Sequence, residues 1–184
     1  MMGALPDSRQ VIDFWFAEAE PSQWWRSDPA FDRLIAERFG SVHARAAKCE
    51  LYEWRADPLG RLAEVIVLDQ FCRNIHRNSP AAFANDALAL ALAQEAIGAG
   101  AAVLLEPRLR AFLYMPFMHS ESLRIHGVAV KLFSEAGLES NLNFEYRHKA
   151  IIERFGRYPH RNALLGRTSS PEEIAFLETP GSSF

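Results

Sequence analysis

The chain has 184 residues, of which 49% are hydrophobic and 23% charged, and its formal net charge is −3 at pH 7. This composition is typical of a globular protein and excludes a disordered chain, and the length suits a single domain spanning residues 1–184. So small a negative charge gives no overall attraction to nucleic acid or to an anionic membrane, and neither is expected as a partner.

The N-terminal residues contain no basic segment followed by an apolar one, so no secretory signal is expected. Charges interrupt every apolar stretch well short of the ~18 residues that a membrane span needs. Cys49 and Cys72 form no CxxC pair and are expected to be reduced thiols. The expected location is therefore the cytoplasm.

Helix signals occur along the whole chain. A capping residue precedes proline, the combination that favours a helix start, at Asp28-Pro29, Asp57-Pro58, Ser79-Pro80 and Ser170-Pro171. Glycines that suit helix ends stand at Gly40, Gly98, Gly137 and Gly156. No segment alternates polar and apolar residues as a strand would, so the fold is expected to be all-α. The expected helices are 7–19, 29–39, 41–53, 58–76, 80–98, 107–118, 120–136, 143–155 and 171–178.

The helix near 58–76 differs from the others because apolar residues cover nearly its whole circumference between Leu62 and Cys72. A helix that is apolar all round is expected at the centre of the fold, in a compact array of about eight or nine antiparallel helices. It would carry Asp69, with Gln70, Arg73 and Asn74, close to the core. A buried carboxylate needs a partner, because an unpaired one costs several kcal/mol.

The first candidate site lies on this helix, where Asp69, Arg73 and Arg77 follow one another at intervals of four residues. One interpretation is a salt bridge along the helix, which would be purely structural. The other is an arginine oriented by an aspartate to hold a carboxylate or phosphate, with Asn74 beside it. The sequence leaves both interpretations open.

The second candidate site contains His119 and Glu121. Pro116 should end or kink the preceding helix, and Ser120 should cap the next one. His119 is either a structural histidine or a general acid or base acting with Glu121. His119, Ser122 and His126 lack the spacing of a metal site, so neither a metal nor a cofactor is expected.

The third candidate site runs from His148 to Asn162, and it includes Arg157, His160 and Arg161. Between Tyr146 and Arg167 there are six Lys and Arg residues against one acid, Glu153, which gives a local charge of +5. These cationic side chains could lie at helix ends and pair with buried acids such as Asp69. Alternatively, they could form an anion-binding pocket. A nucleic-acid surface is a weaker alternative, because no binding module is present.

Four motifs, in order along the chain, resemble an uncharacterised, mainly bacterial family known as domain of unknown function 924. The motifs are residues 11–16 (VIDFWF), 68–75 (LDQFCRNI), 114–122 (YMPFMHSES) and 154–162 (RFGRYPHRN). The resemblance implies an all-helical, tetratricopeptide-like fold and no established activity. Cys72 departs from the family pattern, which is more like a proline there, and this departure could let the helix continue.

Three functional hypotheses follow. The first is a binding module that holds a small anion or acidic peptide with ligand-binding residues Asp69, Arg73, Asn74, Arg157, His160, Arg161 and Asn162. The second is an acid–base enzyme, hydrolase- or lyase-like, with His119, Glu121 and His148 as catalytic candidates and His160 nearby. The third is that Asp69 pairs with an arginine such as Arg161 and only braces the fold. A homo-oligomer is compatible with all three.

Overall fold

The computed structural model describes residues 5–183, and these residues form helices and loops without any β-strand, which confirms the all-α prediction. Among residues 5–183, no helix combines the length and the apolarity that crossing a membrane requires. Part of the N-terminus on which the signal-sequence prediction rests lies outside the described residues. The α-helices are α1 (Ser8–Asp13), α2 (Pro29–Ala46), α3 (Pro58–Ile66), α4 (Cys72–Ile75), α5 (Asp86–Gly98), α6 (Pro107–Met118), α7 (Leu123–Phe133), α8 (Glu139–Phe155) and α9 (Pro171–Leu177).

Short 3-10 and π-helical segments connect or extend these helices. They are η1 (Phe14–Glu18), η2 (Pro21–Trp24), η3 (Tyr52–Ala56), η4 (Val67–Phe71), η5 (Pro80–Phe83), η6 (Ala102–Leu104) and η7 (Pro159–Arg161). Two of them, η1 and η4, are π-helical. A π-helical segment is rare and occurs frequently at functional sites. Because η4 contains Asp69, its π-helical backbone supports the surroundings of Asp69 as a candidate functional site.

All four capping pairs start helical segments as the sequence predicts. The side chains of Asp28, Asp57, Ser79 and Ser170 accept hydrogen bonds from backbone N–H groups in the first turn of α2, α3, η5 and α9. The proline that follows each cap occupies the first helical position, where its missing N–H has no consequence. Ser170 also forms a reciprocal capping box with Glu173. Local chemistry therefore determines these four starts.

The helix predicted over 58–76 exists as one continuous helical run, α3–η4–α4, with the π-helical segment in its middle. Its apolar side chains from Leu62 to Cys72 are buried, and Asp69 is completely buried among them. Phe71 is buried as well, and its ring contacts those of Phe14, Trp15 and Phe39. The central position predicted for this helix is confirmed.

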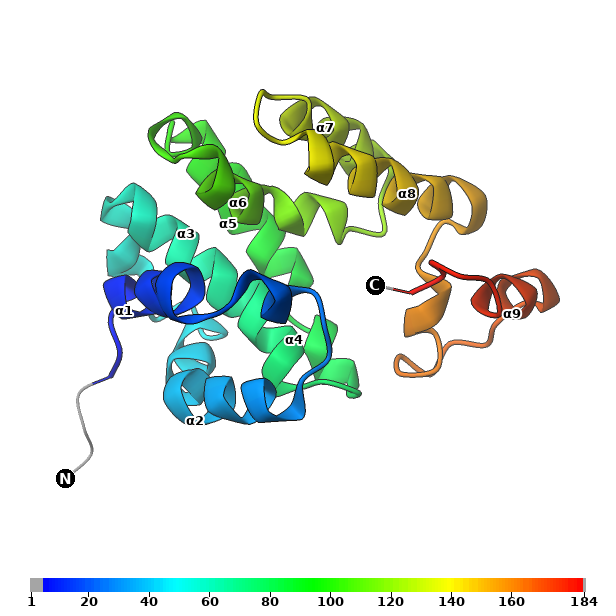
Figure 1. Cartoon of the computed structure of the whole chain (residues 1–184), viewed down its shortest axis with the longest axis horizontal. Helices are drawn as coiled ribbons and strands as arrows, with labels where there is room; N and C mark the ends of the chain where they lie inside the picture. The colour runs from blue at the N-terminus through cyan, green and yellow to red at the C-terminus, as the bar shows by residue number, and fades with distance from the viewer. Residues whose placement is uncertain (1–4, 184) are drawn as a thin grey trace.

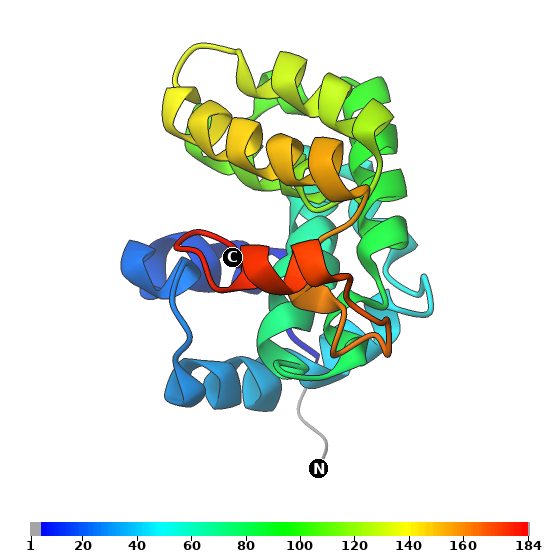
Figure 2. The same cartoon turned by 90° about the vertical axis from the view of Figure 1, so that its right-hand side faces the viewer.

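The other helices surround this run. The helices α1, α5 and α6 pack on α3, whereas α2 packs on η4 and α4. Farther along the chain, α6 packs on α7 and α7 on α8, and the α7–α8 pair lies at the end of the molecule opposite α2 (Figures 1 and 2). Successive helices thus pack on each other from α5 to α8, as a helical array requires. The likeness to tetratricopeptide repeats stays a prediction.

Some predicted boundaries were wrong. Gly40 does not end a helix, since α2 continues through it to Ala46, and the helix predicted over 41–53 does not exist. The range 80–98 divides into η5 and α5. Ser120 is not the cap of α7, which begins at Leu123 after Ser122, so His119 ends α6 instead of belonging to α7. Burial of the apolar side of α2 outweighs the weak helix propensity of one glycine.

Candidate functional site

The buried carboxylate of Asp69 has three side-chain partners, and two of them come from its own helix. Gln70 Nε2 donates to Asp69 Oδ2 at 2.6 Å, and Arg73 Nη1 lies 3.1 Å from Asp69 Oδ1. The third partner comes from the end of α6, where His119 Nδ1 lies 2.7 Å from Asp69 Oδ1. The predicted requirement for a partner is therefore met by these three residues and not by Arg161.

Arg161 reaches the same cluster through a second acid, Asp86, at the start of α5. Arg73 Nη1 and Nη2 lie 3.0 and 3.1 Å from the two Asp86 oxygens, and Arg161 Nη1 lies 3.1 Å from Asp86 Oδ2. Arg161 Nη2 also donates to the backbone oxygen of His119 at 3.0 Å. Asp69, Arg73, Asp86 and Arg161 thus form a row of alternating charges, and the contacts of Asp69 and Arg161 with His119 join the three candidate sites.

A cavity of about 370 Å³ opens beside this row, a volume in the range of small-molecule sites. We call it the His119 cavity. Its polar lining includes Asp86, His119, Ser120, Glu121 and Arg161. Its apolar lining is Pro80, Phe83, Ala84, Ala87, Leu90, Pro116 and Leu165. Segments from η5 to η7 therefore surround a space with a polar and an apolar side.

His119 is held in one orientation at this cavity. Its Nδ1 faces the Asp69 carboxylate, which can only accept, so Nδ1 carries the proton. Its Nε2 makes no hydrogen bond to any of residues 5–183, and 16% of the side chain is exposed. The imidazole therefore offers a free lone pair at a cavity, while a buried carboxylate fixes its tautomer.

Burial and the local charges set the protonation of this pair. Burial favours the uncharged form of His119 and lowers its pKa, and Arg73 acts in the same direction against the attraction of Asp69. Burial would raise the pKa of Asp69, but Arg73 and the hydrogen bonds from His119 and Gln70 outweigh it, and the pKa lies below its usual value. At neutral pH the pair is thus a neutral imidazole and a carboxylate.

Arg161 is positioned by aromatic rings as well as by ion pairs. Its guanidinium carbon lies 4.6 Å from the ring centroids of both Phe83 and Tyr158. Its Nε is buried and has no hydrogen-bond partner among the described residues. This clamp fixes the guanidinium at the edge of the His119 cavity.

Glu121, predicted to act with His119, has other partners. Arg167 binds both of its carboxylate oxygens at 2.6 and 2.9 Å, and the backbone N–H of Tyr158 donates to it at 2.7 Å. Burial opposes ionisation of Glu121, but these contacts prevail and lower its pKa. Glu121 lines the cavity as a carboxylate bound to Arg167, which is a poor state for a proton donor.

Two of the predicted ligand-binding residues brace the C-terminal segment instead of reaching the cavity. Arg157 forms a two-point ion pair with Glu173 at 2.7 and 2.8 Å. Asn162 is completely buried, and it donates to Ser169 and accepts from Arg167. Neither residue lines the His119 cavity.

Asn74, His148 and His160 do not line the His119 cavity either. Asn74 donates to Asp32 of α2 at 2.7 Å. His148 is buried in α8, and its Nδ1 lies 2.8 Å from the backbone oxygen of Phe144. The ring of His160 packs against that of Tyr158. Of the predicted residues, His119, Glu121 and Arg161 line the cavity. Asp69 and Arg73 do not line it, and they are linked to it through contacts with His119 and Asp86.

The positive segment 146–167 is largely neutralised by acids from elsewhere in the chain. Arg154 pairs with Glu172 at 2.8 Å, Arg157 with Glu173, Arg161 with Asp86 and Arg167 with Glu121. Lys149 pairs with Glu153, the one acid within the segment, which the count of +5 already includes. Arg147 forms no ion pair with residues 5–183, and its guanidinium lies 5.5 Å from the centroid of the Phe144 ring. The +5 counted in the sequence therefore does not correspond to a basic surface.

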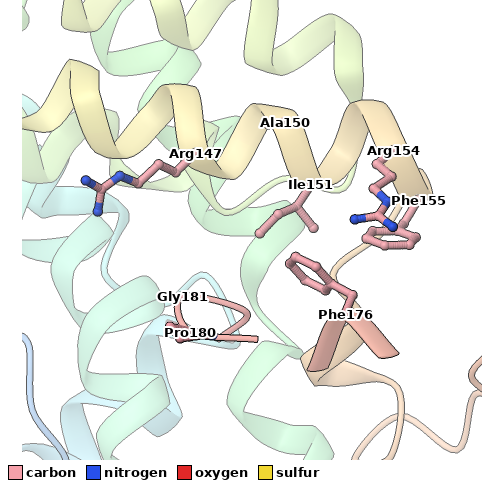
Figure 3. Close-up of a pocket in the computed structure, with 8 residues that line it drawn as sticks. All are labelled: Arg147, Ala150, Ile151, Arg154, Phe155, Phe176, Pro180 and Gly181. Carbon is pink, nitrogen blue, oxygen red and sulfur yellow. The ribbon is translucent and has the colours of Figure 1, made fainter. Parts of the chain in front are cut away.

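A second cavity, of about 400 Å³, lies between α8 and the C-terminal segment (Figure 3). Phe176 of α9 faces Ile151 across it, and Arg147 and Arg154 stand on its α8 side. Arg154 stacks on Phe155 at 4.7 Å and is bound by Glu172. Because none of the buried titratable groups described above lines this cavity, it is a weaker candidate for chemistry.

Sequence reasoning missed Asp86 and Phe83, which complete the site. Asp86 follows Asn85 at the start of α5, but the Ser79-Pro80 signal upstream predicted a single helix from residue 80. A break between η5 and α5 would have placed an acid in the first turn of a helix. Phe83 gave no signal, because its role depends on Arg161, which is distant in sequence.

Stability should depend on pH through the buried histidines. Burial lowers the pKa of His148 to about 3 and that of His160 to about 4, from an ordinary 6.5. Below pH 6.5 the unfolded chain therefore binds protons that the folded chain does not, and folding weakens as the pH falls. Each group should lower the unfolding free energy by up to about 1.4 kcal/mol per pH unit between about pH 6 and pH 5.

Urea denaturation at a series of pH values would measure this slope. His148→Asn keeps a donor for the Phe144 carbonyl but cannot titrate. It should therefore reduce the slope of unfolding free energy against pH by roughly the contribution of one histidine. Asn143→Ala, at an exposed position of α8 without an ionisable side chain, serves as the control and should leave the slope unchanged. An identical slope in the wild type and in His148→Asn would contradict the prediction.

The comparisons with known proteins agree with this fold. Residues 11–181 match the family described as "Bacterial protein of unknown function (DUF924)". A solved structure of a protein of unknown function from Agrobacterium tumefaciens, ATU0120, is 38% identical, covers 93% of this chain and 96% of its own, and has a TM-score of 0.88. No curated protein matches the chain. Since the match spans most of the chain, the protein belongs to the DUF924 family of bacterial proteins of unknown function.

Proposed function

We propose that this chain binds a small organic molecule in the His119 cavity, with an anionic group of the ligand against Arg161 and a hydroxyl or water against His119 Nε2. The observation that carries the proposal is a His119 imidazole with a free Nε2 at a cavity of about 370 Å³. The apolar side formed by Phe83, Leu90 and Leu165 suits the carbon skeleton of such a ligand.

The charges near the cavity favour a compact ligand over a long acidic peptide. Three arginines, Arg73, Arg161 and Arg167, face three acids, Asp69, Asp86 and Glu121, so these six groups sum to zero. A ligand anion at Arg161 would compete with the Asp86 carboxylate for the same guanidinium. This one guanidinium would be its only favourable charge interaction. We therefore expect moderate affinity for a singly charged carboxylate or phosphate ester.

A thermal-shift screen of small carboxylates and phosphate esters, each paired with its neutral amide or alcohol, would test this proposal. The charged member of a binding pair should raise the Tm more than the neutral one. Arg161→Gln should weaken binding about 10- to 100-fold, because a hydrogen bond to a charged group contributes about 1.5–3 kcal/mol. Arg157→Gln is the matched control, since Arg157 lies outside the cavity. Equal losses in both variants, or no Tm shift across the panel, would contradict the proposal.

The Asp69–His119 pair favours a second candidate function, an acid–base enzyme acting on the same ligand. His119 would take a proton from the bound hydroxyl or water, and Asp69 would stabilise the imidazolium that forms. His119→Asn keeps an N–H donor for Asp69 and removes the base. It should lower turnover of a ligand found in the screen about 10²- to 10⁴-fold, while binding changes only a few-fold.

The pH profile would provide an independent readout of that chemistry. Because burial lowers the pKa of His119 below its ordinary 6.5, less than half of the base is protonated at pH 6.5, and the rate there should exceed half of its maximum. A rate that halves near pH 6.5, or turnover that survives in His119→Asn, would contradict a role for His119 as the base.

Three broader expectations are also proposed. A cytoplasmic location is supported by the two free thiols, Cys49 and Cys72. A tetratricopeptide-like array is supported by the sequential packing of α5, α6, α7 and α8. A single domain over residues 1–184 is supported by one large hydrophobic core cluster that runs from Val11 to Leu138.

A further inference from the structure

Three side chains that can ligate a metal meet where α2 packs against α4, and none of them lines the His119 cavity. His43 comes from the last turn of α2, Cys72 begins α4, and His76 caps its end. One ligand atom from each residue lies within 4.8 Å of the other two. Cys72 and His76 are four residues apart, so the helix places both on one side.

Asn85 shows where the lone pairs of this cluster converge. Its Nδ2 lies 3.1 Å from His43 Nε2 and 3.5 Å from Cys72 Sγ. A single amide group therefore approaches both atoms and holds the electropositive position that a cation would take. Rotation of the amide would present Oδ1 to the same position, so Asn85 can supply a fourth ligand.

We propose that His43, Cys72 and His76 bind one Zn²⁺ ion, with Asn85 Oδ1 or a water molecule in the fourth position. Zinc is typically tetrahedral with nitrogen and sulfur ligands, at about 2.0–2.1 Å from nitrogen and 2.3 Å from sulfur, which puts ligand atoms roughly 3.5 Å apart. The ligand atoms, which lie within 4.8 Å of one another, would need to come closer by about 1.3 Å at most. Thiolate and imidazole select zinc over magnesium or calcium.

The environment of the cluster suits such a site. Cys72 is completely buried and His43 is 7% exposed, whereas His76 is only half-buried, so an ion could enter past His76. Burial of His43 favours the neutral form of its ring, which is the form that ligates a metal. Cys72 donates to the Ala81 carbonyl, and it would release its proton when the ion binds.

The proposed ion would tie α2 to α4, next to Arg73. Its role is therefore structural, and it is independent of the small-molecule ligand at the His119 cavity. This proposal departs from the expectation, drawn from spacing along the sequence, that no metal binds. His43 lies on a different helix from Cys72 and His76, and only the packing of α2 on α4 joins them.

Cobalt substitution of chelator-treated protein would test the site. Titrated Co²⁺ should produce a thiolate-to-cobalt charge-transfer band that saturates at one equivalent, and Zn²⁺ should abolish it. Cys72→Ser should remove the band, while Cys49→Ser, which changes the exposed cysteine, should keep it. His76→Gln changes a half-buried ligand at a helix end and should weaken Zn²⁺ binding about 100-fold or more.

Thermal denaturation with and without Zn²⁺ would give a second readout. One equivalent of Zn²⁺ should raise the Tm of the wild type and of Cys49→Ser, and it should raise the Tm of His76→Gln much less. If Cys72→Ser does not fold, as circular dichroism would show, His76→Gln decides the question. The proposal is overturned if no charge-transfer band forms, if the band depends on Cys49, or if Zn²⁺ binds His76→Gln as tightly as the wild type.

Discussion

Replacing Asp69 by alanine should lower the unfolding free energy by about 3–5 kcal/mol, one of the largest losses expected in this protein. The change removes the acceptor for His119, Gln70 and Arg73 at once and leaves the Arg73 guanidinium half-buried with one acid fewer. Asp69→Asn keeps the shape and one acceptor oxygen, so its loss should be smaller. Urea denaturation at pH 7 would measure both variants.

A double-mutant cycle would identify the partner of Asp69. The cycle between Asp69 and Arg73 should give a coupling of more than about 1 kcal/mol, because the two groups are in contact. The pairing of Asp69 with Arg161, which the sequence suggested, should couple less, because Arg161 contacts Asp86 instead. Arg157 pairs with Glu173 and not with Asp69, so it provides the control, for which the effects of the two substitutions should add. Additive effects for Asp69 and Arg73 would contradict the site as described.

Gly60→Ala should destabilise the protein by about 2–4 kcal/mol, although alanine is the better helix former. Gly60 lies in the first turn of α3, and a Cβ built on it would sit 2.1 Å from the backbone oxygen of Trp54. Because the obstacle is backbone, no side-chain rotation can relieve the clash. Either η3 or the start of α3, where the helical run that carries Asp69 begins, would have to move.

Gly40→Ala is the matched control in α2, where an added Cβ meets nothing within 4 Å. This substitution should stabilise the protein by about 0.5–1 kcal/mol, through the ordinary difference in helix propensity. Opposite signs for the two glycines in thermal or urea denaturation would confirm the close approach at Gly60. A neutral or stabilising Gly60→Ala would contradict it.

Sequence alone determined the features that depend on neighbouring residues. The Asp-Pro and Ser-Pro pairs predicted four helix starts, because a capping side chain and a preset proline act within one turn. Apolar residues around the whole circumference of 62–72 predicted a central helix and a buried Asp69, and both are found. The helix end predicted at Gly40 was wrong, because a single glycine is a weak signal and burial of the apolar side of α2 outweighs it.

Only the tertiary structure decided which polar residues share a site. Asp69, His119, Asp86 and Arg161 lie on separate segments, and their contacts depend on how α5, α6 and η7 pack around the central helix. The apparent excess of positive charge between residues 146 and 167 disappeared for the same reason, since acids such as Glu121 and Glu173 reach it from other segments. Local pattern determines a helix because its hydrogen bonds are local. A site depends on contacts between distant residues, and no local pattern encodes them.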